Sequence, residues 1–372
     1  MTSIIYVGMD VHTTNYTLCC YSMEDDRFFA EVQVEPDAKN ILKYLARIEK
    51  QQSRDCRIVC GYEAGCLGYS LYHQLHAHGI DCVILAPTTM MTKPGKRIKT
   101  DRRDARLISK CLAFHTYSPV YIPTEVDDAV KEYIRMRDDA NSALARVKQQ
   151  IIAFCIRHGK IHDGKSYWTN KHLEWLSSLD LGNKILSEVL QEYLIRYYQL
   201  REQVDMYDMR INELAQAEPY RQKVEKLGCF RGIAAHTALS FCVEVGDFRR
   251  FATAQQFASY LGLVPGECSS GDKQQYIGIT KAGNSHLRKL LVETAQVFGR
   301  SATKSGKSVA LKERQAKCDS LTVAYADKAN ARLKKKYFKI AMRSKVNIAK
   351  TAVAREMACF IWGMMTDNIS CA

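Results

Sequence analysis

Four acidic residues in three separate stretches of the chain have the types and spacing of a metal site. Asp10 ends the apolar run IIYVGMD, and Glu63 follows a second apolar run in the segment GYEAG. Asp101 and Asp104 lie three residues apart in KTDRRDARL, so they share one face of a helix. Carboxylates that gather closely cannot all stay ionised without a cation, and hard oxygen ligands select Mg²⁺ or Mn²⁺. Two such ions about 3.5–4 Å apart can hold the attacking and leaving oxygens of a phosphodiester.

Basic side chains surround the aspartate pair, namely Lys99, Arg102, Arg103 and Arg106. A solvated helix face would explain such a mixture, and an isolated Asp-x-x-Asp is weak evidence of a site. Together with acids at two strand ends, however, the pattern predicts that the acids hold metal while the cations hold a polyanion.

A pair of serines lies in a basic loop farther along the chain. Ser269 and Ser270 precede a glycine and Lys273. A serine hydroxyl in such a loop can attack phosphorus, although two loop serines usually have no catalytic role. His236 and His286 could assist, but single histidines on helices are more often structural. The residues alone leave the role of this loop open.

The overall composition predicts a polyanionic partner. The chain of 372 residues carries 54 Lys and Arg against 40 Asp and Glu, a net charge of +14, which favours nucleic acid over an anionic membrane surface. The fourteen cysteines are scattered and form no C-x-x-C pair, which favours reduced, buried thiols over a zinc site. The N-terminus lacks the pattern of a signal peptide, and no apolar stretch is long enough to span a bilayer. We therefore expect a cytoplasmic protein that does not bind membranes.

The strands and helices that would position the four acids follow one another in a specific order. Strands are expected at 4–10, 15–21, 28–34, 57–62 and 81–85, and helices from about 37, at 67–78 and at 100–114 with Thr100 as N-cap. Three strands before the first helix, followed by βαβ units, is the order of an α/β RNase H-like domain. The first and fourth strands would be neighbours, so Asp10 and Glu63 would end side by side and the last helix could bring Asp101 and Asp104 to them.

The rest of the chain is expected to be mainly helical. Two long apolar stripes, over 126–156 and 186–214, predict a coiled-coil-like arm with its turn near Gly164. The following segment LGCFRGIAAHTALSFCVEVGDFRRF resembles a helix-hairpin-helix, whose backbone amides commonly contact phosphates. The alternative is that its glycines only mark the ends of ordinary helices. Basic residues mixed with aromatics at 331–345 favour nucleic-acid binding over a solvated face.

These segments together resemble the DEDD transposases of the IS-110 / IS-1111 insertion-sequence type. The matching pieces are YVGMDVH at 6–12, GYEAG at 61–65, KTDRRDARLIS at 99–109, and FASYLGLVPGECSSGDKQQYIGITKAGNSHLRKLLVETA at 257–295. The resemblance implies a RuvC-like catalytic domain over 1–118, a helical arm used for subunit association over 119–219, and a mostly helical C-terminal transposase domain over 220–372.

The resemblance also implies roles for individual residues. Asp10, Glu63, Asp101 and Asp104 would form a catalytic quartet that binds Mg²⁺ or Mn²⁺, and Ser270, with Ser269 as second choice, would be the nucleophile. The implied reaction is DNA strand cleavage and exchange through a phosphoserine. The residues expected to contact nucleic acid are Lys99, Arg102, Arg103, Arg106, Lys273, Lys281 and Arg288.

The implied partners are DNA, a noncoding bridge RNA encoded by the element, and further copies of the chain. The acids and the serine lie in different domains, and the family's composite active sites combine the acids of one subunit with the serine of another. We therefore expect a dimer to tetramer. The resemblance also implies a prokaryotic cell. Three alternatives remain: a Piv-type DNA invertase that needs no RNA guide, a RuvC-like metal-dependent nuclease that needs no serine, and a DNA-binding protein without catalysis.

Overall fold

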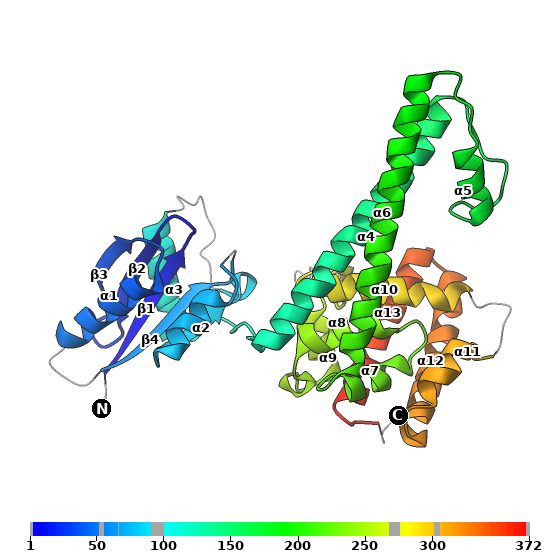
Figure 1. The fold of residues 1–372 in the computed structure, drawn as a ribbon. Coiled ribbons are helices and arrows are strands. Elements are labelled where there is room, and N and C mark those ends of the chain that lie inside the picture. The colour runs from blue at the N-terminus through cyan, green and yellow to red at the C-terminus, as the bar shows by residue number, and fades with distance from the viewer. Residues whose placement is uncertain are drawn as a thin grey trace. The chain divides into compact units, whose positions relative to one another are not determined.

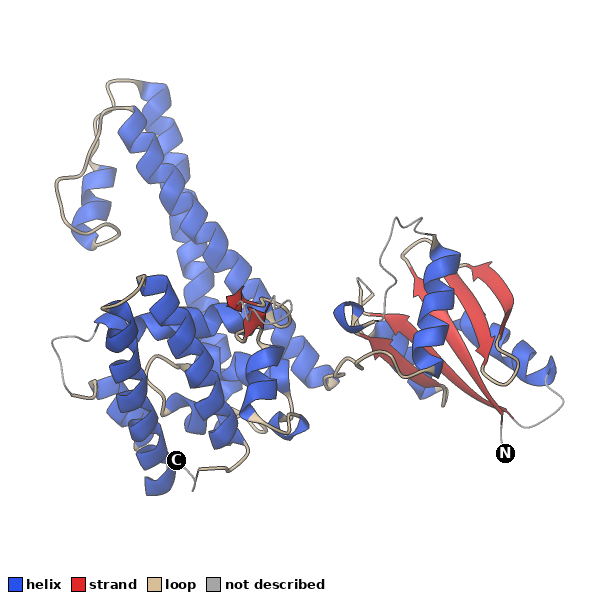
Figure 2. Cartoon of the chain, turned by 180° about the vertical axis from the view of Figure 1, so that it is seen from behind, coloured by secondary structure: helices blue, strands red, loops and turns tan. Residues whose placement is uncertain are grey.

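The computed structural model describes residues 3–51, 56–65, 67–90, 100–267, 276–300 and 306–369. The chain divides into two compact units, residues 1–122 and residues 123–372. The first unit is a mixed α/β layer structure, and the second is helical apart from one short hairpin (Figure 2).

Unit 1 contains a five-stranded sheet with the strand order β3-β2-β1-β4-β5 (Figure 1). Strands β1, β2 and β3 form an antiparallel meander, while β4 and β5 join β1 in parallel. The strands are β1 (Ser3–Val11), β2 (Tyr16–Ser22), β3 (Arg27–Val34), β4 (Cys56–Glu63) and β5 (Asp81–Leu85). The five-stranded α/β unit and the helical remainder expected from the sequence are both confirmed.

Helices cover both faces of this sheet. Ile5, Val7 and Met9 of β1 pack into one core together with α1 (Ala38–Gln51) and α2 (Ser70–Ala77). Tyr6 lies on the opposite face, in a second core that contains Ile108 and Leu112 of the helix α3 (Asp101–Ala113). The alternation follows from the pleat of a strand, which sends successive side chains to opposite faces.

Two local expectations need adjustment. Helix α2 begins at Ser70, three residues after the predicted start, because Leu67 to Tyr69 form a turn that includes Gly68 in the left-handed region, at φ 55°. Thr100 occupies the N-cap position of α3 with extended backbone, but its side chain makes no capping hydrogen bond. A short 3₁₀ helix, η1 (Pro87–Thr89), follows β5.

In unit 2, two long helices form the predicted arm. Helices α4 (Glu125–Arg157) and α6 (Lys184–Gln216) lie side by side, and α5 (Asn170–Ser177) packs beside them (Figure 1). Each long helix has 33 residues, which corresponds to a length of about 50 Å. The predicted turn near Gly164 lies in the connection between α4 and α5.

The base of the arm is part of the C-terminal helical core. Val130 and Ile134 of α4 and Ile211 of α6 belong to the same buried cluster as the later helices. Those helices are α7 (Arg221–Gly228), α8 (Ala235–Val245), α9 (Ala254–Tyr260), α10 (Ser285–Arg300), α11 (Val309–Gln315), α12 (Ser320–Ala341) and α13 (Val346–Met365). A 3₁₀ turn, η2 (Phe248–Arg250), and an unpredicted hairpin of β6 (Pro265–Glu267) and β7 (Tyr276–Ile279) complete the unit.

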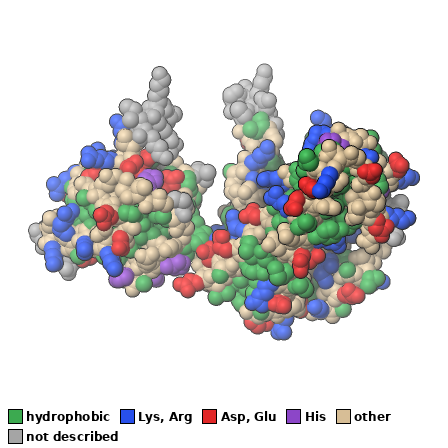
Figure 3. Space-filling view, turned by 45° about the horizontal axis from the view of Figure 1, so that its top comes forward, with side chains coloured by type: hydrophobic (Ala, Val, Ile, Leu, Met, Phe, Trp, Pro, Cys, Tyr) green, Lys and Arg blue, Asp and Glu red, His purple; other side chains and the backbone are tan. Residues whose placement is uncertain are grey.

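Within the described ranges, every helix is too short or too polar to cross a lipid bilayer. On the face shown in Figure 3, Lys and Arg side chains are interleaved with Asp and Glu over both units.

Candidate active site

Helix α3 lies in direct backbone contact with β1 at Gly8. A Cβ atom at this position would lie 2.0 Å from the carbonyl oxygen of Ala105 and 2.4 Å from the amide nitrogen of Ser109. Because both obstacles are backbone atoms, no side chain fits here unless the helix moves. The glycine of the GMD segment thus sets how closely α3 approaches the sheet.

This contact brings Asp10 and Asp101 to the same place. Asp10 follows Gly8 by two residues and therefore faces α3, while Asp101 precedes Ala105 by four residues on that helix. Two strand residues advance about 6.6 Å, and four helical residues advance about 6 Å. The two carboxylates are thus displaced by similar distances from the crossing point.

The result is a compact group of possible metal ligands. Asp10, His12 and Asp101 each offer one ligand atom, and these atoms lie within 4.8 Å of one another. Burial raises the pKa of the Asp10 carboxyl above its usual range, the proximity of His12 lowers it, and the charges of Asp104 and Asp101 raise it further. A bound cation would offset both the burial and the repulsion.

Asp104 and Glu63 lie beside this group rather than within it. Asp104 is one helical turn beyond Asp101, and its charge acts on Asp10. Met9 of β1 is paired with Tyr62 of β4, so Asp10 and Glu63 follow as the next residues of two parallel neighbours. Adjacent strands are about 4.8 Å apart, which places both acids at one edge of the sheet. Glu63 itself is exposed.

Unsatisfied oxygen atoms at this corner support a cation site. Oδ2 of Asp10, Oδ1 of Asn15 and Oγ1 of Thr17 are three of the five buried side-chain polar atoms without a hydrogen-bond partner in the described part of the chain. Thr17 pairs with Asp10 across β1 and β2 and is 1% exposed. Because buried oxygens are normally hydrogen-bonded, such a concentration indicates a missing positive or proton-donating group. The residues present therefore fit a hydrated divalent ion.

The predicted basic residues near α3 are partly engaged within the protein. Nε of Arg106 lies 2.6 Å from Oε2 of Glu31, and Nε of Arg102 lies 3.3 Å from Oε1 of the same residue. The Arg106 guanidinium also lies over the ring of Phe28, 5.4 Å from its centroid. Arg103 is exposed, and Lys99 falls outside the described residues. Glu31 thus holds two of these cations beside the acidic site.

Ser269, Ser270 and Lys273 also fall outside the described residues, but the segments on both sides of them are described. The amide of Thr280 donates to the carbonyl of Val264, and the amide of Lys281 donates to that of Gly262. Nη1 of Arg288 donates to the carbonyl of Leu261, so this predicted nucleic-acid contact also supports the end of α9. The two backbone bonds join the two arms of the hairpin to each other, and Arg288 of α10 ties the first arm to the helical core.

A buried network of charges joins the arm to this hairpin region, and the sequence alone did not reveal it. Nε2 of His286 lies 2.8 Å from Oδ2 of Asp138 on α4, and its Nδ1 lies 3.0 Å from Oε1 of Glu244 on α8. Glu244 also accepts hydrogen bonds from Asn284 and Arg135. A double-sided contact with carboxylates requires both ring nitrogens to carry protons, so the His286 ring is an imidazolium.

The pKa values of this network follow from its ion pairs. Burial alone would lower the pKa of His286, but the hydrogen bonds to Asp138 and Glu244 outweigh it and raise the pKa to about 9. Burial would raise the pKa of Glu244, yet the bonds from His286 and Asn284 lower it to about 2. The pKa of Asp138 is likewise held well below its usual range, against its burial, by His236 and His286. Two carboxylates and one imidazolium are thus stable as ions at neutral pH.

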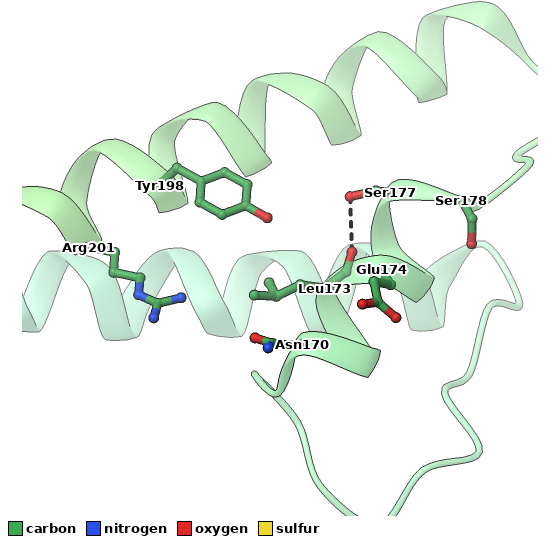
Figure 4. A pocket seen from close by; sticks show the side chains of 7 residues that line it. All are labelled: Asn170, Leu173, Glu174, Ser177, Ser178, Tyr198 and Arg201. Carbon is green, nitrogen blue, oxygen red and sulfur yellow. Dashed lines mark hydrogen bonds between the residues drawn. The ribbon is translucent and has the colours of Figure 1, made fainter.

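A separate pocket of about 610 Å³ lies between α5 and α6. Figure 4 shows Tyr198 and Arg201 projecting from α6 and Glu174 lying on α5. The hydroxyl of Ser177 donates to the carbonyl of Leu173 at 3.0 Å, so this lining serine is already engaged in its own helix. The residues that line this pocket belong to unit 2, whereas the acidic group belongs to unit 1.

Comparison with known proteins gives two matches to transposase family models. The model of DEDD transposases matches residues 7–156, and the model described as the transposase IS116/IS110/IS902 family matches residues 225–314. The first match contains all four acids, and the second contains the serine pair.

Similar proteins extend these matches over most of the chain. The Sinorhizobium fredii protein y4qE is 36% identical over 82% of this chain and 75% of its own length. The transposase for insertion sequence element IS1533 of Leptospira borgpetersenii is 32% identical over 90% of this chain and 95% of its own. The transposase for insertion sequence element IS1111A of Coxiella burnetii is 26% identical over 68% of this chain and 71% of its own. On these matches, and with its five-stranded α/β unit, this chain belongs to the IS116/IS110/IS902 family of insertion-sequence transposases.

Proposed function

We propose that this transposase breaks and rejoins DNA strands at an acidic metal site, using a serine hydroxyl as the nucleophile. The observation that carries the metal part is the convergence of Asp10 and Asp101, which come from segments 91 residues apart, at one edge of the sheet beside unsatisfied buried oxygens. In this proposal unit 1 is a RuvC-like domain, and Asp10, Glu63, Asp101 and Asp104 hold Mg²⁺ or Mn²⁺.

Each part of the site would have a distinct task. A divalent ion, when bound, would polarise a phosphate oxygen of the DNA and neutralise developing charge. The carboxylates at the end of β1 and the start of α3 would fix the position of this ion. The exposed Arg102, Arg103 and Arg106, together with Lys99, would hold the DNA backbone against this edge.

The serine would carry the covalent step. The Ser270 oxygen, or that of Ser269, would form a bond to phosphorus as the phosphorus–oxygen bond of the DNA strand breaks. The serine proton would be lost, the released sugar oxygen would gain a proton, and the phosphoserine would conserve the bond for rejoining. The support is the family match over this segment, together with the backbone hydrogen bonds that join the two arms of the hairpin.

The proposed reaction involves further copies of the chain, DNA and an RNA. Acids and serine lie in different units of the chain, so a composite site drawn from two subunits is proposed, in a dimer to tetramer. Lys273, Lys281 and Arg288 would contact nucleic acid near the serine loop. An element-encoded bridge RNA would select sequences by base pairing, and the support for it is family similarity together with the net charge of +14.

A plasmid recombination assay tests the two catalytic parts separately. Asp101→Asn and Ser270→Ala should each abolish recombination, and Ser178→Ala, at an exposed serine directly after α5, should not. If Ser270→Ala and Ser269→Ala both keep full activity, the serine step is wrong and a metal-only nuclease is favoured. If Asp101→Asn keeps full activity, the metal site is wrong.

The RNA requirement is tested in the same assay with the noncoding DNA that flanks the gene included or deleted. Loss of recombination only after deletion, with restoration when that RNA is supplied from a second plasmid, would support guidance. Unchanged recombination would favour an invertase-like reaction without a guide.

A further inference from the structure

His12 occupies a position that the acidic quartet does not include. It follows the last residue of β1, and its amide donates to the carbonyl of Asn15 at 3.0 Å, which closes the turn between β1 and β2. Asp10 and His12 are two residues apart on an extended backbone, so their side chains leave the same face. That face is the one against which α3 packs.

The imidazole approaches Asp10 closely without satisfying it. Nε2 of His12 lies 3.3 Å from Oδ2 of Asp10, yet this oxygen accepts no hydrogen bond of acceptable geometry. The imidazole nitrogen and one carboxylate oxygen each from Asp10 and Asp101 lie within 4.8 Å of one another. Three potential ligand atoms at these mutual distances are compatible with a single shared ion.

A second observation at the same corner points to a ligand. Thr17 is 1% exposed, lies opposite Asp10 on β2 and has a hydroxyl oxygen without a hydrogen-bond partner. The side-chain amide oxygen of Asn15, a residue of intermediate exposure, is also buried and without a partner. Small divalent ions keep several water molecules when they bind to proteins. Water on such an ion would donate to these two oxygens, which otherwise remain buried and unsatisfied.

We propose that His12 is a direct ligand of the divalent ion, so that this site prefers Mn²⁺ to Mg²⁺. The inference rests on the proposed metal site and adds a nitrogen ligand to it. Mn²⁺ accepts the same carboxylate, carbonyl and water oxygens as Mg²⁺, but as a first-row transition metal it also accepts an imidazole nitrogen, which Mg²⁺ takes far less readily. Nε2 of His12 would be the unprotonated ring nitrogen, with the proton on Nδ1. About half of the side chain, 46%, is exposed, so an ion can reach it from solvent.

Pulsed electron paramagnetic resonance of Mn²⁺ bound to the full-length protein tests this directly. The wild type should show coupling of Mn²⁺ to a directly bound nitrogen, and His12→Ala should lack it. Loss of a ligand should also weaken Mn²⁺ binding by at least about tenfold in calorimetry, with a smaller effect on Mg²⁺. His76→Ala, an exposed histidine on α2 of the same unit, should leave both measurements unchanged.

The outcomes separate this inference from the function on which it rests. If Asp10→Asn abolishes Mn²⁺ binding while the wild type shows no nitrogen coupling and His12→Ala binds normally, His12 is not a ligand and only this inference fails. If Asp10→Asn leaves Mn²⁺ binding unchanged, the proposed metal site itself fails. The nitrogen coupling of the wild type needs no substitution, so a folding defect in a variant cannot decide the result.

Discussion

Replacing Gly8 by alanine tests how the acidic site is held together. The added Cβ would lie 2.0 Å from the carbonyl oxygen of Ala105 and 2.4 Å from the amide nitrogen of Ser109. Relieving the first contact requires α3 to move away from β1 by about 1 Å or more, because carbon and oxygen atoms do not approach that closely. Overpacking of this kind costs about 3 kcal/mol in folding free energy.

Hydrogen exchange followed by mass spectrometry measures this cost within the full-length chain. A loss of about 3 kcal/mol corresponds to roughly hundredfold faster exchange in the peptides of β1 and α3. Peptides of α4 and α6, which belong to the other unit, should exchange at the wild-type rate. The same displacement would separate Asp101 from Asp10, and a misplacement of about 1 Å can cost 10²-fold in rate, so recombination should fall by about that factor.

Gly306→Ala is the matched control, because a Cβ atom at that position meets nothing within 4 Å. It should change neither the exchange of β1 and α3 nor the rate of recombination. If Gly8→Ala exchanges like the wild type in both elements, the close contact between α3 and the sheet is wrong, and so is the reason given for the convergence of the two aspartates.

Two further predictions concern the charged groups around the sites. His286 has its pKa raised to about 9, so its contribution to stability, roughly 3 kcal/mol, is complete below about pH 6.5 and is lost as the pH rises through 9. Urea unfolding at pH 6 and pH 10 can be followed by tryptophan fluorescence, which reports on unit 2 because all three tryptophans lie there. The wild type should lose stability between the two pH values, and His286→Gln should not show this loss. Equal losses of stability in both proteins would contradict the prediction. Glu31→Gln should strengthen binding to nonspecific duplex DNA several-fold at low salt and steepen its salt dependence by about one unit, because Arg102 and Arg106 lose their internal partner. Fluorescence anisotropy with the exposed Glu49→Gln as control checks this, and an equal effect of both substitutions would disprove the role of Glu31.

Much of unit 1 was predictable because its signals are local. Apolar, β-branched runs between polar turns indicated five strands in the correct order, and three strands before the first helix indicated that β1 and β4 would be neighbours. The long apolar stripes likewise predicted α4 and α6. The positions of Asp10 and Glu63 at strand ends followed from the same local patterns. The hairpin of β6 and β7 was missed because its strands have only three and four residues.

The sequence by itself determined the element order, the acidic and serine motifs and the family to which the chain belongs, since these depend on residues close together in the chain. Only the tertiary structure decided that α3 touches β1 at Gly8, that His12 joins Asp10 and Asp101, and that His286 links α4 to α8. Each of these contacts joins side chains from separate elements or depends on the exact direction of a side chain. No spacing along the chain specifies such contacts, because they arise only when helices and strands pack to exclude water.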